Sequence, residues 1–215
     1  MSKKAQQAIS SSAWLSQIPN GIAETLLARA TEVSFKRDAL IYEFDDPPGG
    51  IYGVQSGIVA IRTDDGDTGV VYGQLFGVGA WFGESAALLG MRRQVGVTVL
   101  SETARLYSVS RASLEQTAAR DATLWRALAG LSALNNGVAI QVARDLMIRK
   151  PRERFLAVLK RLSKSIEPEQ SLPLSQDELA VMCALSRGSI SRLLSALEEE
   201  GQIERSYRSI RLLAP

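Results

Sequence analysis

The chain has 215 residues, of which 46% are hydrophobic and 22% charged, and its formal net charge is +2. This length and apolar content are enough for one large or two small globular domains. The chain has no apolar run of about 18 residues and no signal-peptide core near its start. We therefore expect a cytoplasmic protein that neither spans a membrane nor is exported.

The sequence contains no histidine and a single cysteine, Cys183. Histidine-dependent catalytic triads, histidine metal sites and histidine-ligated haem are therefore excluded, as are an intrachain disulfide and a four-cysteine iron–sulfur cluster. We expect no metal site and no enzyme, since a barrel enzyme of the cupin type needs histidine ligands. Cys183 falls in a short turn between two predicted helices, where a small apolar core residue is a better interpretation than a redox thiol.

The first half of the chain changes from helical to β-rich character. Residues 14–30 predict one or two short helices around the Pro19-Asn20-Gly21 break. Between Val33 and about Val109, short β-rich runs alternate with turn signals at 45–50 and 64–67. The runs are residues 39–44, 51–61, 68–76, 95–100 and 104–109. Strands at this spacing favour an antiparallel roll or barrel.

Residues 111–149 contain no proline and predict one long helix. Six of its residues recur at alternating spacings of four and three, as in a coiled-coil seam with one polar member. They are Leu124, Leu128, Leu131, Asn135, Val138 and Val142. We interpret them as a parallel dimer seam in which Asn135 fixes the register. The alternative, a helix that packs on its own barrel, stays open. Apolar residues off the stripe, available for packing within the chain, are Trp125, Leu134, Ile140 and Leu146.

Two short helices with a tight turn follow an amphipathic helix over 152–164. Ser175 and Glu178 form the pattern of a capping box, which starts the first helix. Ser186 repeats the N-cap role a few residues later, and Gly201 ends the second helix. The apolar face of the second helix comprises Ile190, Leu193, Leu194 and Leu197.

The other face of this second helix is basic and hydroxylated. It carries Arg187, Ser189, Ser191, Arg192 and Ser195. Such a face on the second of two short helices is typical of a helix-turn-helix that presents donors to base edges and phosphates. The alternative is an ordinary helical hairpin. After Gly201 the chain alternates as a small hairpin, or wing, whose Arg205, Arg208 and Arg211 can reach phosphates.

With a roll, a long helix and a winged helix-turn-helix in this order, the chain resembles the cyclic-AMP receptor protein/FNR (CRP/FNR) family of bacterial transcription regulators. Three segments carry the resemblance: residues 35–61 with Gly57, residues 79–99 and residues 174–203. The resemblance implies an α+β fold. Its expected parts are an N-terminal antiparallel β-roll of the cyclic-nucleotide-binding kind over 14–110, a dimerisation helix over 111–149 and a winged helix-turn-helix DNA-binding domain over 150–215.

The resemblance also implies a function. A homodimer of this kind binds an inverted repeat in double-stranded DNA, with RNA polymerase as a partner. The DNA-binding candidates are Ser186, Arg187, Gly188, Ser189, Ser191 and Arg192. In the family, an Arg at the position of Arg187 reads a guanine, and Arg192 matches a second base or phosphate contact. The alternative is an interaction protein whose roll controls a protein partner without specific DNA readout.

By the same resemblance, residues 79–99 look like the phosphate-binding cassette of cyclic-nucleotide domains. Glu84 would accept a hydrogen bond from a ribose hydroxyl and Arg93 would hold a cyclic phosphate, beside backbone N–H groups at a helix N-terminus. The effector-binding candidates are Gly83, Glu84, Ser85, Arg93 and Gln94.

The sequence departs from the nucleotide-binding members at two places in this site. Gln94 stands where the family has a small Ser, Thr or Ala. Near the positions where those members contact the base, this chain has Ala139 and Ile140, whose side chains cannot hydrogen-bond. A cyclic nucleotide, another small effector and no ligand at all therefore stay open as alternatives, the last with Glu84 and Arg93 as an ion pair that stabilises the roll.

Overall fold

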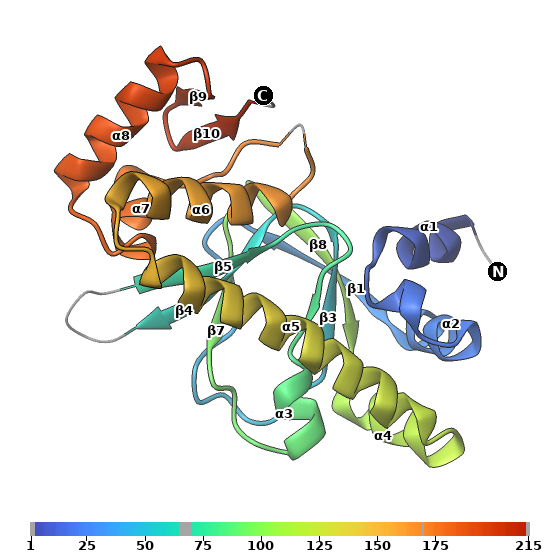
Figure 1. Cartoon of the computed structure of the whole chain (residues 1–215). Helices are drawn as coiled ribbons and strands as arrows, with labels where there is room; N and C mark the ends of the chain where they lie inside the picture. Colours follow the sequence, from blue (N-terminus) through green and yellow to red (C-terminus); the bar gives the residue numbers. More distant parts are fainter. Residues whose placement is uncertain (1–2, 65–69, 169, 214–215) are drawn as a thin grey trace. The chain divides into compact units, whose positions relative to one another are not determined.

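The computed structural model describes residues 3–64, 70–168 and 170–213 (Figure 1). It divides into two compact units. The first consists of Met1–Val59 and Phe76–Val138, and the second of Ala60–Leu75 and Ala139–Pro215. Among the described residues, no helix is both long and apolar enough to cross a membrane.

The N-terminal region is helical. Helix α1 (Lys3–Ser11) precedes a 3-10 turn, η1 (Leu15–Gln17), and α2 (Asn20–Arg29) follows it. The helices expected over 14–30 are therefore present as η1 and α2, with the break at Pro19. Trp14 is almost fully buried, and its indole Nε1 donates to the carbonyl of Ala127 at 2.7 Å.

Two four-stranded sheets form the roll, as expected for the fold class. In the first, the order is β1 (Thr31–Lys36), β8 (Thr103–Val109), β3 (Ile51–Ser56) and β6 (Trp81–Phe82). The ladders are antiparallel, and β8 pairs Leu106 with Val33 on one side and Val54 on the other. The second sheet has the order β2 (Leu40–Tyr42), β7 (Gly96–Val99), β4 (Val59–Asp64) and β5 (Val70–Phe76). Most of the turn expected at 64–67 lies outside the described residues.

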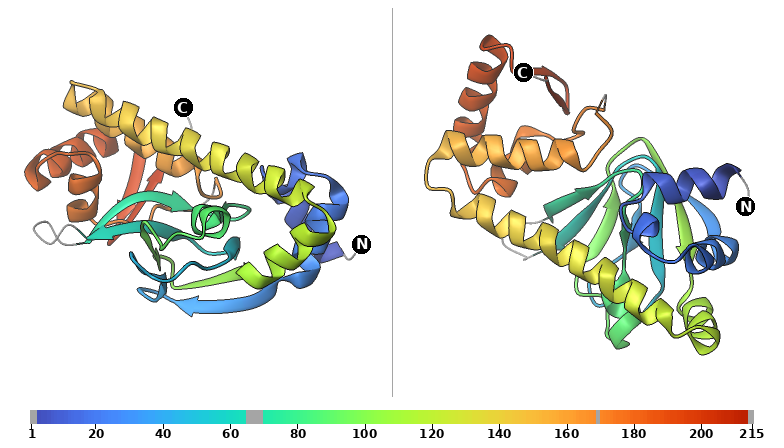
Figure 2. Two further views of the ribbon diagram at one scale, coloured as in Figure 1. Left: turned by 90° about the horizontal axis from the view of Figure 1, so that it is seen from below. Right: turned by 45° about the vertical axis from the view of Figure 1, so that its right-hand side comes forward.

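The expected single helix over 111–149 is wrong, because the structure has two helices there. These are α4 (Arg111–Arg120) and α5 (Thr123–Met147), and Figure 2 shows α5 continuous in both views. The Asp121 carboxylate between them accepts from the backbone N–H of Thr123 at 3.0 Å and from its hydroxyl at 2.6 Å. Asp121 thus competes with the helical hydrogen bonds and starts a new helix.

The expected dimer seam needs a correction at its first three members. Leu124, Leu128 and Leu131 are buried inside the chain, with exposed fractions of 0, 0 and 2%, in one core cluster with Trp14 and Leu26. A side chain that already packs in its own core offers no surface to a second chain. For these three residues, the alternative that the helix packs on its own barrel describes the structure. Asn135, Val138 and Val142 are half-buried.

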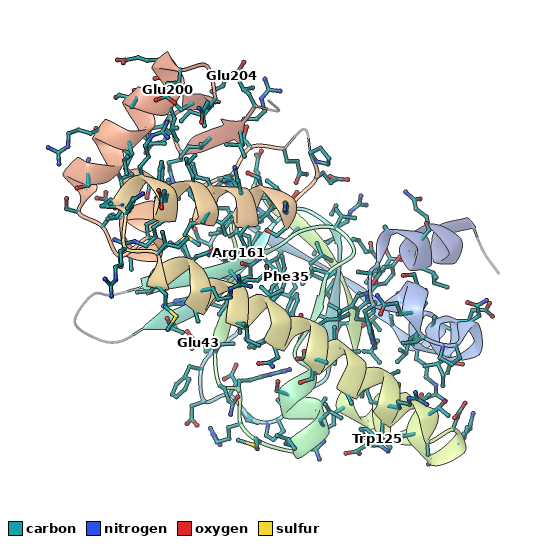
Figure 3. All side chains as sticks on the ribbon, in the orientation of Figure 1. Phe35, Glu43, Trp125, Arg161, Glu200 and Glu204 are labelled. Carbon is teal, nitrogen blue, oxygen red and sulfur yellow. The ribbon has the colours of Figure 1, made fainter. Side chains whose placement is uncertain are left out.

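The apolar residues of α5 that point outward are those we expected to pack within the chain. They are Trp125, Leu134, Ile140 and Leu146, and Met147 is exposed as well. Trp125 lies near the start of α5 (Figure 3) and Ile140 is 53% exposed. The sequence pattern thus separates the two sides of this helix, but the first half of the stripe predicted to face a second chain packs in the chain's own core.

The C-terminal region has the predicted order of elements. Helix α6 (Pro151–Lys164) begins with proline in its first turn, where a missing N–H costs nothing. Helices α7 (Gln176–Met182) and α8 (Arg187–Glu199) follow, and then the hairpin of β9 (Ile203–Ser206) and β10 (Ser209–Leu212). This is the winged helix-turn-helix expected from the sequence.

Candidate nucleic-acid interface and effector site

Both predicted helix starts in the helix-turn-helix are confirmed. At α7 the Ser175 side chain accepts from the Glu178 N–H, and Glu178 accepts from the Ser175 N–H, which completes the capping box. At α8 the Ser186 side chain accepts from the Ser189 N–H at 3.2 Å. Gly201 ends α8 with a φ of +67°, as expected of a glycine in the left-handed region.

The turn between α7 and α8 is held by an arginine of α6. Ala184 has a φ of +48°, a strained conformation for a residue with a Cβ. Arg154 Nε donates to the Cys183 carbonyl at 2.7 Å, and its Nη2 donates to the Ala184 carbonyl at 3.1 Å. These two hydrogen bonds stabilise the turn. The role of Arg154 was not predicted, since nothing local in the sequence links α6 to the turn.

The free face of α8 points away from the core of its unit. Ile190, Leu194 and Leu197 are buried beneath the helix. Ser186, Arg187, Gly188 and Arg192 are exposed, and Ser189 and Ser191 are half-exposed. The structure therefore brings the six candidate DNA-binding residues together at the N-terminal half of one exposed helix face.

Arg187 has an acidic neighbour that sequence reasoning missed. Its Nε lies 3.4 Å from the Asp177 carboxylate of α7, and the two side chains are 71% and 66% exposed. Exposed ion pairs of this kind contribute about 0–1 kcal/mol. A guanine contact is worth about 1–3 kcal/mol, so the pair does not prevent Arg187 from turning to a base.

The arginines of the wing are also paired within the unit. Arg208 Nη2 lies 2.8 Å from Glu178, Arg205 Nε lies 2.6 Å from Glu198, and Arg211 pairs with Glu204. Glu204 and Glu200 lie near the start of the wing and the end of α8 (Figure 3). The expectation that these arginines reach phosphates therefore requires each of them to exchange a carboxylate for a phosphate.

A groove of about 480 Å³ opens between α7, α8 and the wing. Its lining includes Asp177, Arg187, Arg205, Tyr207 and Arg208. Tyr207 at the wing tip is 92% exposed. The groove combines cationic, hydroxyl and aromatic groups, which suits a phosphate backbone beside base edges.

Cys183 is a core residue, as the sequence predicted. It is fully buried, and burial raises the pKa of its thiol to about 12, with smaller opposing effects of Arg154 and Arg161.

We expect iodoacetamide to leave native protein unmodified near pH 8 and to alkylate unfolded protein, as measured by intact mass. Folding raises the pKa of this thiol above its ordinary value of 9. The contribution of the thiol to the free energy of unfolding is therefore fully present below pH 9 and is lost as the pH rises from 9 towards 12. Alkylation at equal rates in both states would contradict the core assignment.

Two of the effector candidates, Glu84 and Arg93, form a buried cluster with Gly83 at the start of α3 (Glu84–Leu89). Gly83 caps α3 with a φ of +93°. Glu84 and Arg93 are 4% and 5% exposed. Arg93 Nη1 donates to the Gly83 carbonyl, and its Nη2 donates to the Gly50 carbonyl, both at 2.9 Å.

Glu84 has partners of its own. The amide Nδ2 of Asn135 donates to Glu84 Oε2 at 3.1 Å and to the Trp81 carbonyl at 3.2 Å. The Glu84 and Arg93 side chains therefore bind separate groups, and the expected alternative of a Glu84–Arg93 ion pair does not describe them. Ser85 is exposed and lies 3.5 Å from Glu84, and Gln94 is exposed. Among the described residues, no group of three or more His, Cys, Asp or Glu side chains could hold a metal ion.

The surroundings of Arg93 were also missed by sequence reasoning. The Tyr42 ring lies 4.1 Å from the guanidinium carbon, a cation–π contact. A Cβ on Gly49 would lie 2.4 Å from Arg93 Nη2, and a Cβ on Gly50 would lie 1.8 Å from the Val109 carbonyl oxygen. The signal in the sequence is the Gly49-Gly50 pair, which by itself indicates only a turn.

Family models match two separate segments of the chain. A model of the cyclic nucleotide-binding domain matches residues 32–121, and a model of the Crp-like helix-turn-helix domain matches residues 153–215. The chain belongs to the CRP/FNR family. It is thus a transcription regulator of the CRP/FNR type, with the fold that the sequence predicted.

Solved structures of CRP/FNR proteins share the fold. FixK2 from Bradyrhizobium japonicum is 25% identical, with a TM-score of 0.73 over 86% of this chain and 93% of its own. A CRP/FNR-family transcriptional regulator from Thermus thermophilus is 26% identical, with a TM-score of 0.67 over 86% and 94%. The c-di-GMP responsive regulator CLP of Xanthomonas campestris is 24% identical, with a TM-score of 0.71 over 92% and 100%. No curated protein matches the sequence significantly.

The CRP/FNR resemblance gives Gly188 a testable role in base preference. Gly188 is exposed at the second position of α8, and a Cβ there meets no atom within 4 Å. We expect Gly188→Glu to place a carboxylate where it can accept from cytosine N4, shifting the preferred base at one position per half-site by about 1–3 kcal/mol. Competition among four operators that differ at that base pair measures the shift. Gly188→Gln is the isosteric control, and an unchanged base preference in Gly188→Glu would contradict this geometry.

Proposed function

We propose that this CRP/FNR protein is a homodimer that binds an inverted-repeat operator specifically and regulates transcription with RNA polymerase in the cytoplasm. The observation that carries the proposal is the exposed N-terminal half of α8. There Arg187 is 71% exposed beside the hydroxyls of Ser186 and Ser189, while the apolar side of the helix is buried. This arrangement suits entry into the major groove.

The proposed dimer contact is the outward face of α5. Six of its positions lie two residues beyond the six members of the predicted stripe, and a seventh continues their spacing. The seven are Arg126, Gly130, Ala133, Gly137, Ile140, Arg144 and Met147. An α-helix turns about 100° per residue, so this stripe is rotated by about 200° from the buried one. All seven residues are exposed. The small residues Gly130, Ala133 and Gly137 allow two helices to approach closely, with Ile140 and Met147 supplying apolar area.

In the dimer, two α8 helices enter successive major grooves about 34 Å apart. Any small molecule or contact that favours one arrangement of α5 then changes how closely the separation of the two α8 helices matches the separation of the two grooves. A group that binds both arrangements equally has no effect.

Selection from a random DNA library tests the proposal. We expect an inverted repeat whose half-site centres lie one helical turn apart, bound by two chains in sedimentation equilibrium. The affinity for the selected site should fall as the salt concentration rises, while the protein continues to bind that site more tightly than random competitor DNA. Enrichment of no sequence would overturn the DNA-binding proposal. A single half-site bound by one chain would overturn the dimer.

A further inference from the structure

The buried cluster of the first unit contains two charged side chains that the chain itself satisfies. Glu84 is 4% exposed, and a buried carboxylate needs hydrogen-bond partners to offset its loss of hydration. Asn135, on α5, supplies one at 3.1 Å while the same Nδ2 donates to the Trp81 carbonyl at 3.2 Å. The amide of α5 therefore connects that helix to strand β6 and to the first residue of α3.

Arg93 is satisfied without an anion. Two of its N–H groups donate to the carbonyls of Gly83 and Gly50, and the Tyr42 ring covers its guanidinium. Gly49 and Gly83 leave room for this position, since a Cβ on either would lie within 3 Å of a guanidinium nitrogen. A phosphate placed on Arg93 would have to replace carbonyl contacts that are already made.

Aromatic side chains fill the space next to Arg93. The Tyr42 ring contacts Tyr52 at 5.9 Å and Phe82 at 6.1 Å between ring centroids. Phe82 stacks in turn on Tyr52 at 5.7 Å and on Phe76 at 5.3 Å. Tyr42, Phe76 and Phe82 are each less than 10% exposed. These rings stabilise Arg93 in the position that donates to the chain's own carbonyls.

We propose that Asn135 is a positioning residue that holds α5 on the cassette from within the chain, so that specific DNA binding needs no cyclic nucleotide. This inference rests on the proposed function, because α5 carries the proposed dimer contact. The hydrogen bond of Asn135 to Glu84 sets where α5 lies, as a bound effector otherwise would. The cyclic nucleotide-binding domain then has the structural role of holding α5 in one position.

The first test uses the full chain purified from a host that makes no cyclic nucleotides, with their absence verified by mass spectrometry. We expect this protein to bind the selected operator specifically. Cyclic AMP or cyclic GMP at millimolar concentration should leave the operator affinity unchanged and give no binding heat in calorimetry. Operator binding that appears only with a nucleotide, or measurable nucleotide binding that strengthens it, would overturn the proposal.

The second test changes Asn135 itself. We expect Asn135→Ala to weaken specific operator binding at least about tenfold, because it removes the hydrogen bonds to the buried Glu84 carboxylate and to the Trp81 carbonyl. Asn136→Ala is the matched control, since Asn136 is the exposed neighbour on the same helix, and it should bind as the wild type does. Equal affinity of Asn135→Ala and wild type would overturn the coupling.

A third variant distinguishes positioning from folding. Asn135→Asp puts a second carboxylate against Glu84, and two carboxylates sharing a site raise the pKa of one of them. The other groups facing the site are the Arg93 guanidinium and the Tyr42 and Tyr52 phenols, and burial raises the pKa of the Tyr42 phenol above its ordinary value. We expect the operator affinity of Asn135→Asp, relative to wild type, to recover as the pH falls from about 8 to about 6, because a shared proton restores the hydrogen bond. A ratio independent of pH would overturn the positioning role.

Failure of the proposed function is distinguishable from failure of this inference. A protein that binds no DNA sequence specifically, with or without nucleotide, fails the proposed function. Calorimetry on wild-type protein then decides the inference alone: no nucleotide binding supports a cassette closed by its own side chains, and nucleotide binding overturns it.

Discussion

Arg187→Ala is expected to abolish specific operator recognition while leaving a folded dimer. Each chain would lose one arginine at the exposed N-terminus of α8, so two contacts disappear from the dimer's complex. At about 1–3 kcal/mol per good base contact, the loss is about 2–6 kcal/mol, or roughly 30-fold to 10⁴-fold in affinity. The exposed pair with Asp177 adds little to stability, so the unfolding transition should not move. Gel shift with operator and random competitor, beside sedimentation, measures both effects.

The control for this prediction is Lys160→Ala, which removes the same charge from an exposed position of α6. A phosphate contact, if Lys160 makes one, weakens binding to all sequences alike and lowers the salt dependence. Arg187→Ala should instead reduce the difference between operator and random DNA. Unchanged discrimination in Arg187→Ala would show that α8 does not read the sequence.

The helix-turn-helix could be predicted from the sequence because its signals are local. Ser175 with Glu178, and Ser186 with Ser189, are capping partners three residues apart, and the structure forms both. Gly201 ends α8 in the conformation that favours glycine. The roll followed in the same way from short runs and turn residues. Strand β1 lies outside the five predicted runs, and the run at 51–61 contains two strands, β3 and β4. The two-residue strand β6 was not expected either, since Trp81-Phe82 is too short to show alternation.

The partners of the buried charges could not be predicted, because they are distant in sequence. Arg93 donates to Gly50, 43 residues away, and Glu84 accepts from Asn135, 51 residues away. Asn135 was expected to face a second chain, where a polar residue in an apolar stripe fixes register. The structure gives the same polar residue a partner inside its own chain. Periodicity identifies a helix face but not what covers it.

The two faces of α5 allow core packing and dimerisation to be tested separately. Leu128 is fully buried in its own chain, and Ile140 is 53% exposed, about 120° around the helix from Leu128. We expect Leu128→Ala to lower the free energy of unfolding by about 2–5 kcal/mol, the usual cost of a cavity in a core. Ile140→Glu should leave each chain folded and dissociate the dimer, since it places two like charges in a desolvated apolar contact. Thermal unfolding by circular dichroism and sedimentation equilibrium measure the two effects.

Gln141→Glu is the matched control, because it adds the same charge at the next, exposed position, about 100° around the helix from Ile140. The opposite result would be a dimer that survives Ile140→Glu but dissociates in Leu128→Ala without loss of secondary structure. It would show that the stripe containing Leu128, and not the one containing Ile140, forms the dimer contact. With Ile140→Glu monomeric, operator affinity should fall even though α8 is untouched, because one chain reaches only one half-site. Dimerisation and base reading would then be separable, with α5 setting the spacing that two Arg187 side chains need.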